Sequence, residues 1–209
     1  RFEGVISDLS PGTDYYVRAY IETAFQVYYG NLLSLSTIEE TQVSDADENV
    51  YSVINIGAQT WMLENLRVTR FADGTGIRFA MENSQWVLEG SYAYCWFLNS
   101  ESGNKDIYGA LYNWSIVNSE KDLCPSGWHI PDDADWSVLI EFLGGAEQAG
   151  GKLKEEGTAH WVSPNTGATN ESGFTALPGS YRTATGEFFS VEARTVGAWW
   201  SAGDGGAGS

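Results

Sequence analysis

Residues 122–136, with the sequence "DLCPSGWHIPDDADW", hold the side chains best suited to chemistry. Cys124 and His129 could form a thiol nucleophile and its general base, with Asp133 as a third member. Cys124 precedes Pro125 in a predicted turn, however, and Cys95 is available to it as a disulfide partner. We therefore expect no catalytic dyad in this stretch.

The same stretch is also explained as the start of a helix. Apolar residues recur at positions i, i+3, i+4 and i+7, a helical spacing: Trp136, Leu139, Ile140 and Leu143. Pro131 prevents a helix upstream, and Asp132 is expected to be the N-cap. Asp135 lies three residues further on, as in an acidic variant of the capping box. Gly144 is expected to supply the left-handed exit.

A second polar stretch, "HWVSPNTGATNESGF" at 160–174, has the residue types of a sugar-binding loop. Trp161 offers an aromatic face. Asn165, Asn170 and Glu171 offer neutral and charged oxygens, which a calcium ion could share. The alternative is a loop whose Asn and Thr side chains satisfy its own backbone, and the sequence favours that alternative. These four residues are the candidate ligand-binding positions.

The acidic run "DADEN" at 45–49 places Asp45, Asp47 and Asn49 at alternate positions, as in a calcium-binding EF-hand loop. Val50 stands where that loop needs a glycine, so we interpret the run as an acidic turn. The sequence contains no HExxH, Cys-x-x-Cys or GxSxG motif and no phosphate-binding loop. We expect no enzyme activity and no resident cofactor, with calcium as the one candidate ion.

The composition argues against several classes of partner. The formal net charge is −17, and the 11 basic residues form no cluster. Nucleic acids and anionic membrane surfaces are therefore not expected partners, because both need clustered Lys and Arg. No run approaches the ~20 apolar residues of a membrane span. The acidity fits solubility outside the cell better than it fits binding of divalent cations.

Cys95 and Cys124 are the two cysteines of the chain. A pair in an acidic chain rich in Gly and Trp fits a secreted protein with one disulfide. Closing that loop would stabilise the fold by roughly 3–4 kcal/mol. Two buried free thiols, or a partner cysteine beyond Ser209, are the alternatives to the Cys95–Cys124 bridge.

Residues 1–38 resemble the end of a fibronectin type III domain. Leu9, Pro11 and Tyr15 have the spacing in which the tyrosine makes the corner before a late strand. A whole sandwich needs about 100 residues, so only its C-terminal strands are expected, followed at 39–49 by a linker and the start of a hairpin. Further on, short buried helices are expected over "DIYGALYNWSIVN" (106–118) and around 152–156. The rest of 146–209 is expected to form loops and short strands.

Several pieces together resemble one family, the Fibrobacter succinogenes major paralogous domain. They run in family order: "NIGAQTWMLENLRVTRFADGT", "YAYCWFLN", "IYGALYNWSIVN", "LCPSGWHIPDDADWSVL", "GGKLKEEGTAHWVSPNTGATNESGFTALPGSYR" and "AWWSA". The resemblance implies an α+β, C-type-lectin-like fold over 50–209, with short twisted strands, two short helices and long loops. Family members usually continue past "WWSA", so the domain is expected to be C-terminally incomplete.

The resemblance does not imply a known activity. The fold is shared with sulfatase-modifying enzymes, but their late reactive cysteines have no match here. The "EPN" tripeptide of animal lectins is also missing, because "SPN" at 163–165 lacks the acid. Family domains occur in secreted or surface-anchored proteins of Bacteroidota and Fibrobacterota, often after immunoglobulin-like or fibronectin-like modules.

The expected function is therefore a non-catalytic module, secreted or on the outer-membrane surface, for adhesion or ligand recognition. The expected partner is a surface glycan or a protein. The alternative function is a structural or tip subunit of a surface assembly, which would contact protein partners.

Overall fold

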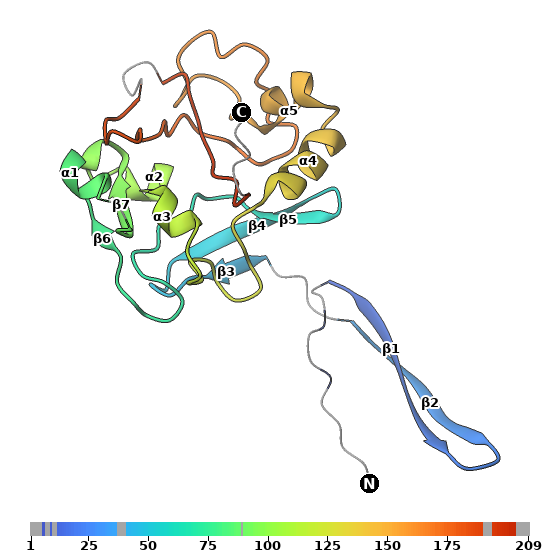
Figure 1. Ribbon diagram of the computed structural model, residues 1–209. Helices are drawn as coiled ribbons and strands as arrows, with labels where there is room; N and C mark the ends of the chain where they lie inside the picture. The colour runs from blue at the N-terminus through green and yellow to red at the C-terminus, as the bar shows by residue number, and fades with distance from the viewer. Residues whose placement is uncertain are drawn as a thin grey trace. The chain divides into compact units, whose positions relative to one another are not determined.

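A computed structural model describes residues 6, 9, 12–36, 41–88, 90–189 and 194–203 (Figure 1). The chain divides into two compact units, Arg1–Thr41 and Gln42–Ser209. Each unit is described by itself below.

The described part of the first unit is a β-hairpin. Strands β1 (Asp14–Glu22) and β2 (Val27–Ser36) pair antiparallel, with Tyr15 opposite Leu35. The N–H and the hydroxyl of Thr23 both donate to the carbonyl oxygen of Gln26, at 2.9 and 2.8 Å, and close the turn. Two strands are thus present where two were expected. Pro11 lies outside the described residues, and the relation to a fibronectin type III domain stays a prediction.

The described part of the second unit has two small sheets. The first is antiparallel, in the order β3-β4-β5, and the second has the order β6-β7-β8. In the second sheet β6 runs parallel to β7 and β8 runs antiparallel to it. The strands are β3 (Gln42–Ser44), β4 (Val50–Ile56), β5 (Gln59–Met62), β6 (Arg78–Phe79), β7 (Ala93–Trp96) and β8 (Ala110–Tyr112).

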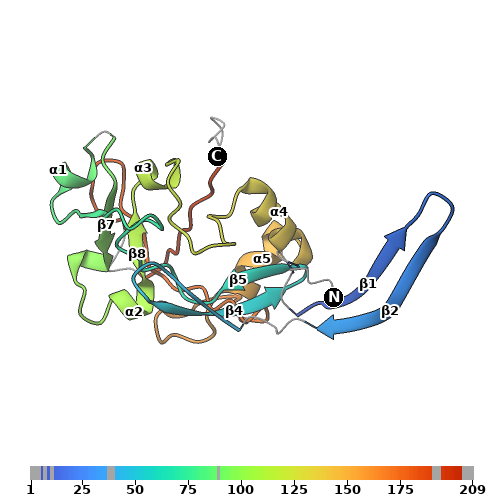
Figure 2. The ribbon, with the colours of Figure 1, turned by 90° about the horizontal axis from the view of Figure 1, so that it is seen from below.

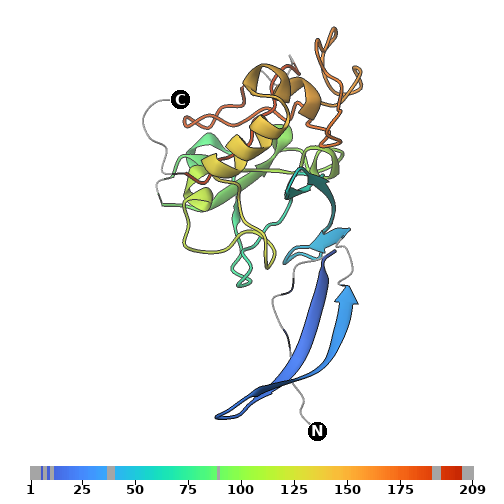
Figure 3. The ribbon, with the colours of Figure 1, turned by 90° about the vertical axis from the view of Figure 1, so that its right-hand side faces the viewer.

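The helices of this unit are short. They are α1 (Asn83–Trp86), the 3₁₀ turn η1 (Phe97–Asn99), α2 (Lys105–Tyr108), α3 (Trp114–Val117), α4 (Asp133–Phe142) and α5 (Ala146–Leu153). Figure 1 shows α1, α2 and α3 grouped around the β6–β8 sheet, and Figure 3 shows α4 and α5 side by side. Beyond Leu153 the described residues form turns and isolated bridges. The α+β class is thus confirmed, and the lectin-like fold stays a prediction.

Helix α4 begins as the sequence predicts. The side chain of Asp132 accepts hydrogen bonds from the backbone N–H groups of Ala134 and Asp135, at 2.8 and 2.9 Å. The Asp135 carboxylate accepts from the N–H of Asp132 at 3.0 Å, which completes the capping box. Gly144 follows the helix with φ +97°, the left-handed conformation expected of it.

The other two helix predictions need correction. The segment 106–118 is not one helix, because Gly109 ends α2 with φ 69° and ψ −160° and the next residues pair with β7 as β8. A Cβ at position 109 would lie 2.6 Å from that of Asn65, so only glycine fits this close approach. The last helix, α5, spans Ala146–Leu153 and thus begins earlier than the predicted 152–156.

Three apolar clusters form the core of the second unit, and β7 separates two of them. Trp96 belongs to the first cluster, with Tyr94 packed against it: Val68, Phe71, Ile77, Trp96, Ala110, Tyr112, Ile116 and Leu123. Ala93 and Cys95 belong to another, with Ala80 and Trp86. Alternate side chains of a strand point to opposite faces, so the two clusters lie on opposite faces of the β6–β8 sheet. The third cluster joins α4 and α5 to the loop that follows: Ile56, Leu139, Leu143, Ala149, Phe174 and Ala176.

A buried guanidinium joins the irregular C-terminal part to the second sheet. Arg182 is buried, with 6% of its surface exposed, and its guanidinium donates to uncharged oxygens. These acceptors are the carbonyls of Gly186, Ala80 and Met81 and the side-chain oxygen of Asn83, at 2.6, 2.5, 3.2 and 3.1 Å. The rings of Trp86 and Phe188 lie 4.9 and 5.1 Å from the guanidinium carbon. Arg182 thereby connects residues 80–86 to residues 182–188, two segments that are far apart in the sequence.

We expect Arg182→Lys to lower the free energy of unfolding by about 2–3 kcal/mol, because an ammonium keeps the charge but leaves buried carbonyls unpaired. Urea denaturation measures the change. The matched control is Arg194→Lys at an exposed position, which should change stability by less than about 0.5 kcal/mol. Equal stabilities for the two variants would contradict the role given to Arg182.

Candidate functional site

The structure places the ring of Trp161 in the interior, not on the surface. Trp161 is 5% exposed, and its indole N–H donates to the carbonyl oxygen of Ala176 at 2.9 Å. The ammonium nitrogen of Lys154 lies 4.4 Å from the ring centroid. The expectation that Trp161 offers an open aromatic face is therefore wrong, because its large apolar ring is buried where the loop packs on residue 176.

The two asparagines of this loop serve its own backbone. Asn165 donates to the carbonyl oxygens of Glu155 and Gly157, at 2.9 and 2.6 Å. Asn170 accepts from the N–H of Thr175 at 2.8 Å and donates to its hydroxyl at 2.9 Å. Both have positive φ, 43° and 48°, a conformation that asparagine tolerates better than most residues. These contacts support the self-satisfied loop that the sequence favoured, with one exception: the side-chain oxygen of Asn165 is buried and has no hydrogen-bond partner among the described residues.

Glu171 is the one residue of the candidate set with a largely exposed side chain. Its side chain is 65% exposed, and its carboxylate lies 3.5 Å from the ammonium of Lys152. The structure therefore brings the four candidates into one loop but does not converge them on a common surface. As a ligand site the set stays a prediction.

The acidic turn binds its own backbone as well. The carboxylate of Asp45 accepts from the N–H groups of Asp47 and Asn49 at 2.9 and 3.0 Å. It also accepts from the Asn49 amide at 2.8 Å and from the Tyr51 hydroxyl at 2.5 Å. Among the described residues, no group of three or more His, Cys, Asp or Glu side chains could hold a metal ion.

His129 belongs to the cap of α4. Its Nε2 lies 2.9 Å from a carboxylate oxygen of Asp135, the residue that also accepts from the N–H of Asp132. The backbone bond from Asp132, and then the bond from His129, hold the pKa of Asp135 below its usual 3.8. The imidazole and the acid thus both act at the helix start, as the structural explanation of this stretch predicts.

The structure contradicts the predicted Cys95–Cys124 disulfide, since both cysteines are free thiols. Cys95 faces the cluster that contains Trp86. Cys124 lies close enough to Tyr112, which packs in the cluster on the other face of the sheet, to act on the Tyr112 hydroxyl electrostatically. The sheet therefore separates the two thiols. Burial raises the pKa of Cys95 to about 11 and that of Cys124 to about 12, which makes both poor nucleophiles at neutral pH.

A pair of exposed tryptophans lies where the chain's last described residues meet α3. Trp114 and Trp200 are 41% and 42% exposed, and their ring centroids lie 5.5 Å apart at an interplanar angle of 47°. We call Trp114 and Trp200 the tryptophan pair. Figure 2 shows the segment that carries Trp200, in red, rising between α3 and α4.

Hydrogen bonds on both sides fix Trp200. Its indole N–H donates to the carbonyl oxygen of Tyr112 at 2.9 Å, and its own carbonyl accepts from the indole of Trp136 at 3.1 Å. Ala202 then donates to the carbonyl of Pro131 at 2.9 Å. The ring is thereby held in place with its polar edge occupied, while 42% of the surface of Trp200 stays exposed.

A hydrogen bond from the residue after Trp200 joins the C-terminal segment to α4. The hydroxyl of Ser201 donates to the carboxylate of Asp133, in the first turn of α4. Asp133 follows the N-cap residue Asp132, and Ser201 lies between Trp200 and Ala202, which are both held by hydrogen bonds. Sequence reasoning used "AWWSA" only as a family piece and did not single out Trp114 or Trp200. The doubled tryptophan in a turn-rich segment was the available signal.

Two small sheets, short helices and a long irregular C-terminal part define the second unit as an α+β domain. The family described as the Fibrobacter succinogenes major domain matches residues 54–208, and the chain belongs to this family. No curated protein and no solved structure matches the chain. None of the helices in the described ranges is long and apolar enough to cross a membrane.

We expect both thiols to resist a disulfide-exchange reagent such as DTNB in the native protein, because their raised pKa values leave little thiolate. In concentrated guanidinium chloride the same preparation should release two equivalents per chain. Release of no equivalents under non-reducing denaturing conditions would show that the predicted disulfide exists after all.

The lowered pKa of Asp135 gives a pH dependence. An acid whose pKa is lower in the folded state stabilises the fold above its unfolded pKa, and that stability is lost as pH falls below 3.8. We expect Asp135→Asn to cost about 0.5–1 kcal/mol at neutral pH and to make the loss below pH ~4 shallower. Urea titrations across pH measure both, with Glu141→Gln on the same helix as the control. An unchanged slope in Asp135→Asn would contradict the assignment.

Proposed function

We propose that the second unit is a non-catalytic recognition module that binds carbohydrate through the tryptophan pair. The observation that carries the proposal is the pair itself, two indole rings that are each about two-fifths exposed and 5.5 Å apart. Large aromatic side chains are usually buried, so two adjacent exposed ones mark an interaction surface.

The chemistry of the pair suits a sugar ring. An indole face is apolar and matches the C–H faces of a pyranose, whereas the sugar's edge carries hydroxyls that need hydrogen-bond partners. We assign such contacts to Ser201, the residue that follows Trp200 in the sequence, and to Asp133, which accepts from the Ser201 hydroxyl. Trp200 is also held in advance by its bonds to Tyr112 and Trp136, so little side-chain entropy is lost on binding.

The proposal includes a location in which surface glycans are accessible, either extracellular or on the outer-membrane surface. Its supports are the net charge of −17, which favours solubility, and the setting in which family domains occur.

We expect Trp200→Ala and Trp114→Ala each to weaken carbohydrate binding by about tenfold or more, as for a central aromatic contact. Affinity electrophoresis in gels that contain xylan, mannan or arabinogalactan measures the retention. The matched control is Phe142→Ala, which removes another exposed aromatic ring, at the other end of α4. Urea denaturation of each variant separates lost binding from lost folding.

Two outcomes would contradict the carbohydrate proposal. One is that no glycan retains the wild-type protein, and the other is that Phe142→Ala weakens glycan binding as much as the tryptophan variants do.

A second candidate function is contact with protein partners as a structural or tip subunit, since tryptophan is also enriched at protein interfaces. Cross-linking on intact cells tests this second function. Two results together would favour it: the wild-type protein binds no glycan, and a cross-linked protein partner of the wild type is lost in Trp200→Ala.

A further inference from the structure

Arg78 is a cation that has no partner among the described residues. Its side chain is exposed at the start of β6, and the guanidinium makes no hydrogen bond, ion pair or ring contact within the part of the chain that the structure describes. Apart from Arg194, the other described lysines and arginines contact a carboxylate, a carbonyl oxygen or an aromatic ring. In a chain with 28 acids and 11 bases, this guanidinium is thus left available.

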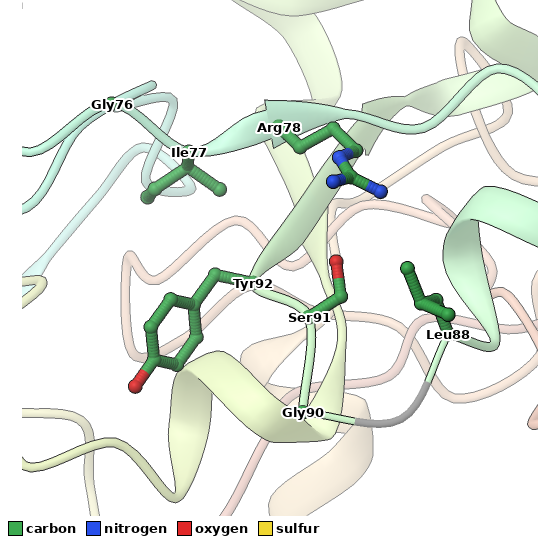
Figure 4. Close-up of a pocket in the computed structure, with 7 residues that line it drawn as sticks. All are labelled: Gly76, Ile77, Arg78, Leu88, Gly90, Ser91 and Tyr92. Atoms are coloured by element: carbon green, nitrogen blue, oxygen red, sulfur yellow. The ribbon is translucent and has the colours of Figure 1, made fainter.

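A pocket of about 700 Å³ opens beside Arg78 (Figure 4). Its lining comes from the start of β6 and from the turn that leads into β7: Gly76, Ile77, Arg78, Leu88, Gly90, Ser91 and Tyr92. Figure 4 shows the Ser91 hydroxyl directed toward the Arg78 guanidinium, with the Leu88 side chain nearby. A cation and a hydroxyl therefore face the same space, which apolar side chains border.

Backbone contacts hold the two walls in a fixed relation. The N–H of Arg78 donates to the carbonyl oxygen of Tyr92 at 3.3 Å. The N–H of Ser91 donates to the carbonyl of Leu88 at 3.1 Å, and the carbonyl of Ser91 accepts from the buried amide of Asn113 at 2.7 Å. The strand pair and the Asn113 bond therefore preorganise the position of the Ser91 hydroxyl relative to β6.

The geometry points to a subsite for a uronic acid, a sugar that carries one carboxylate, in this pocket. The inference rests on the proposed carbohydrate recognition and names a second contact for it. A guanidinium presents two parallel N–H donors, which match the two oxygens of a carboxylate. The lining holds one cation in a chain of net charge −17, so it suits a singly charged group better than a doubly charged phosphate. Ser91 can bond a ring hydroxyl, and Leu88 offers an apolar contact to the ring.

NMR titration with sodium galacturonate tests the subsite at the Arg78 Nε–Hε resonance and at the Ser91 amide. We expect saturable shifts with galacturonate and none with galactose, its neutral counterpart. Arg78→Gln should weaken binding by about tenfold or more, because it removes a charged hydrogen bond. Arg78→Lys should weaken it less, because the charge stays while the paired donors are lost. Arg194→Gln, at another exposed arginine without an acid partner among the described residues, is the matched control and should bind as the wild type does.

Three results would overturn the assignment: equal shifts with galactose, unchanged affinity in Arg78→Gln, or tighter binding of inorganic phosphate or N-acetylalanine at matched ionic strength. The last two probes represent a general anion site and a peptide carboxylate site. The proposed uronic acid subsite and the proposed carbohydrate binding by the tryptophan pair can be contradicted separately. Trp200→Ala should retain the galacturonate shifts, and Arg78→Gln should retain the binding of neutral glycans.

Discussion

The constraint on which the second unit depends is the lack of regular secondary structure in the described residues after Leu153. Backbone N–H and C=O groups that are withdrawn from water must find partners, and in that region few of them find one in a helix or a sheet. Side chains supply the partners instead. Arg182 is the clearest case, because one buried guanidinium satisfies carbonyls from the Ala80–Met81 segment and from Gly186. A buried cation is costly unless its donors are all used, so this arrangement tolerates little change.

The same constraint explains why the most polar loop is scaffolding. Asn165 and Asn170 could coordinate an ion or bond a sugar, but both are engaged with the loop's own backbone and side chains. Trp161 fills the interior and bonds to Ala176. The open aromatic faces lie elsewhere, on Trp114 and Trp200, where a helix start and the C-terminal segment meet. Recognition in this domain is thus proposed at places where the backbone is already satisfied by other groups.

Charge follows a similar division. Most described cations are used within the molecule, as in the ion pairs of Arg70 with Asp47 and Lys121 with Asp73. Because exposed ion pairs contribute little stability, these contacts chiefly relieve repulsion in a strongly acidic chain. Arg78 differs from these cations because it lines the pocket and has no acid partner among the described residues.

The sequence by itself determined the features that depend on neighbours within a few residues. The start of α4 is one, since Asp132 and Asp135 need only their own helix to form the cap. The family is another, because its pieces keep their order along the chain. Only the tertiary structure decided the rest. The 106–118 segment splits because Gly109 lies against Asn65, and Cys95 and Cys124 stay apart because a sheet lies between them. Whether Trp161 or Trp200 is exposed depended likewise on which distant residues pack on each, and no local pattern of residue types encodes that packing.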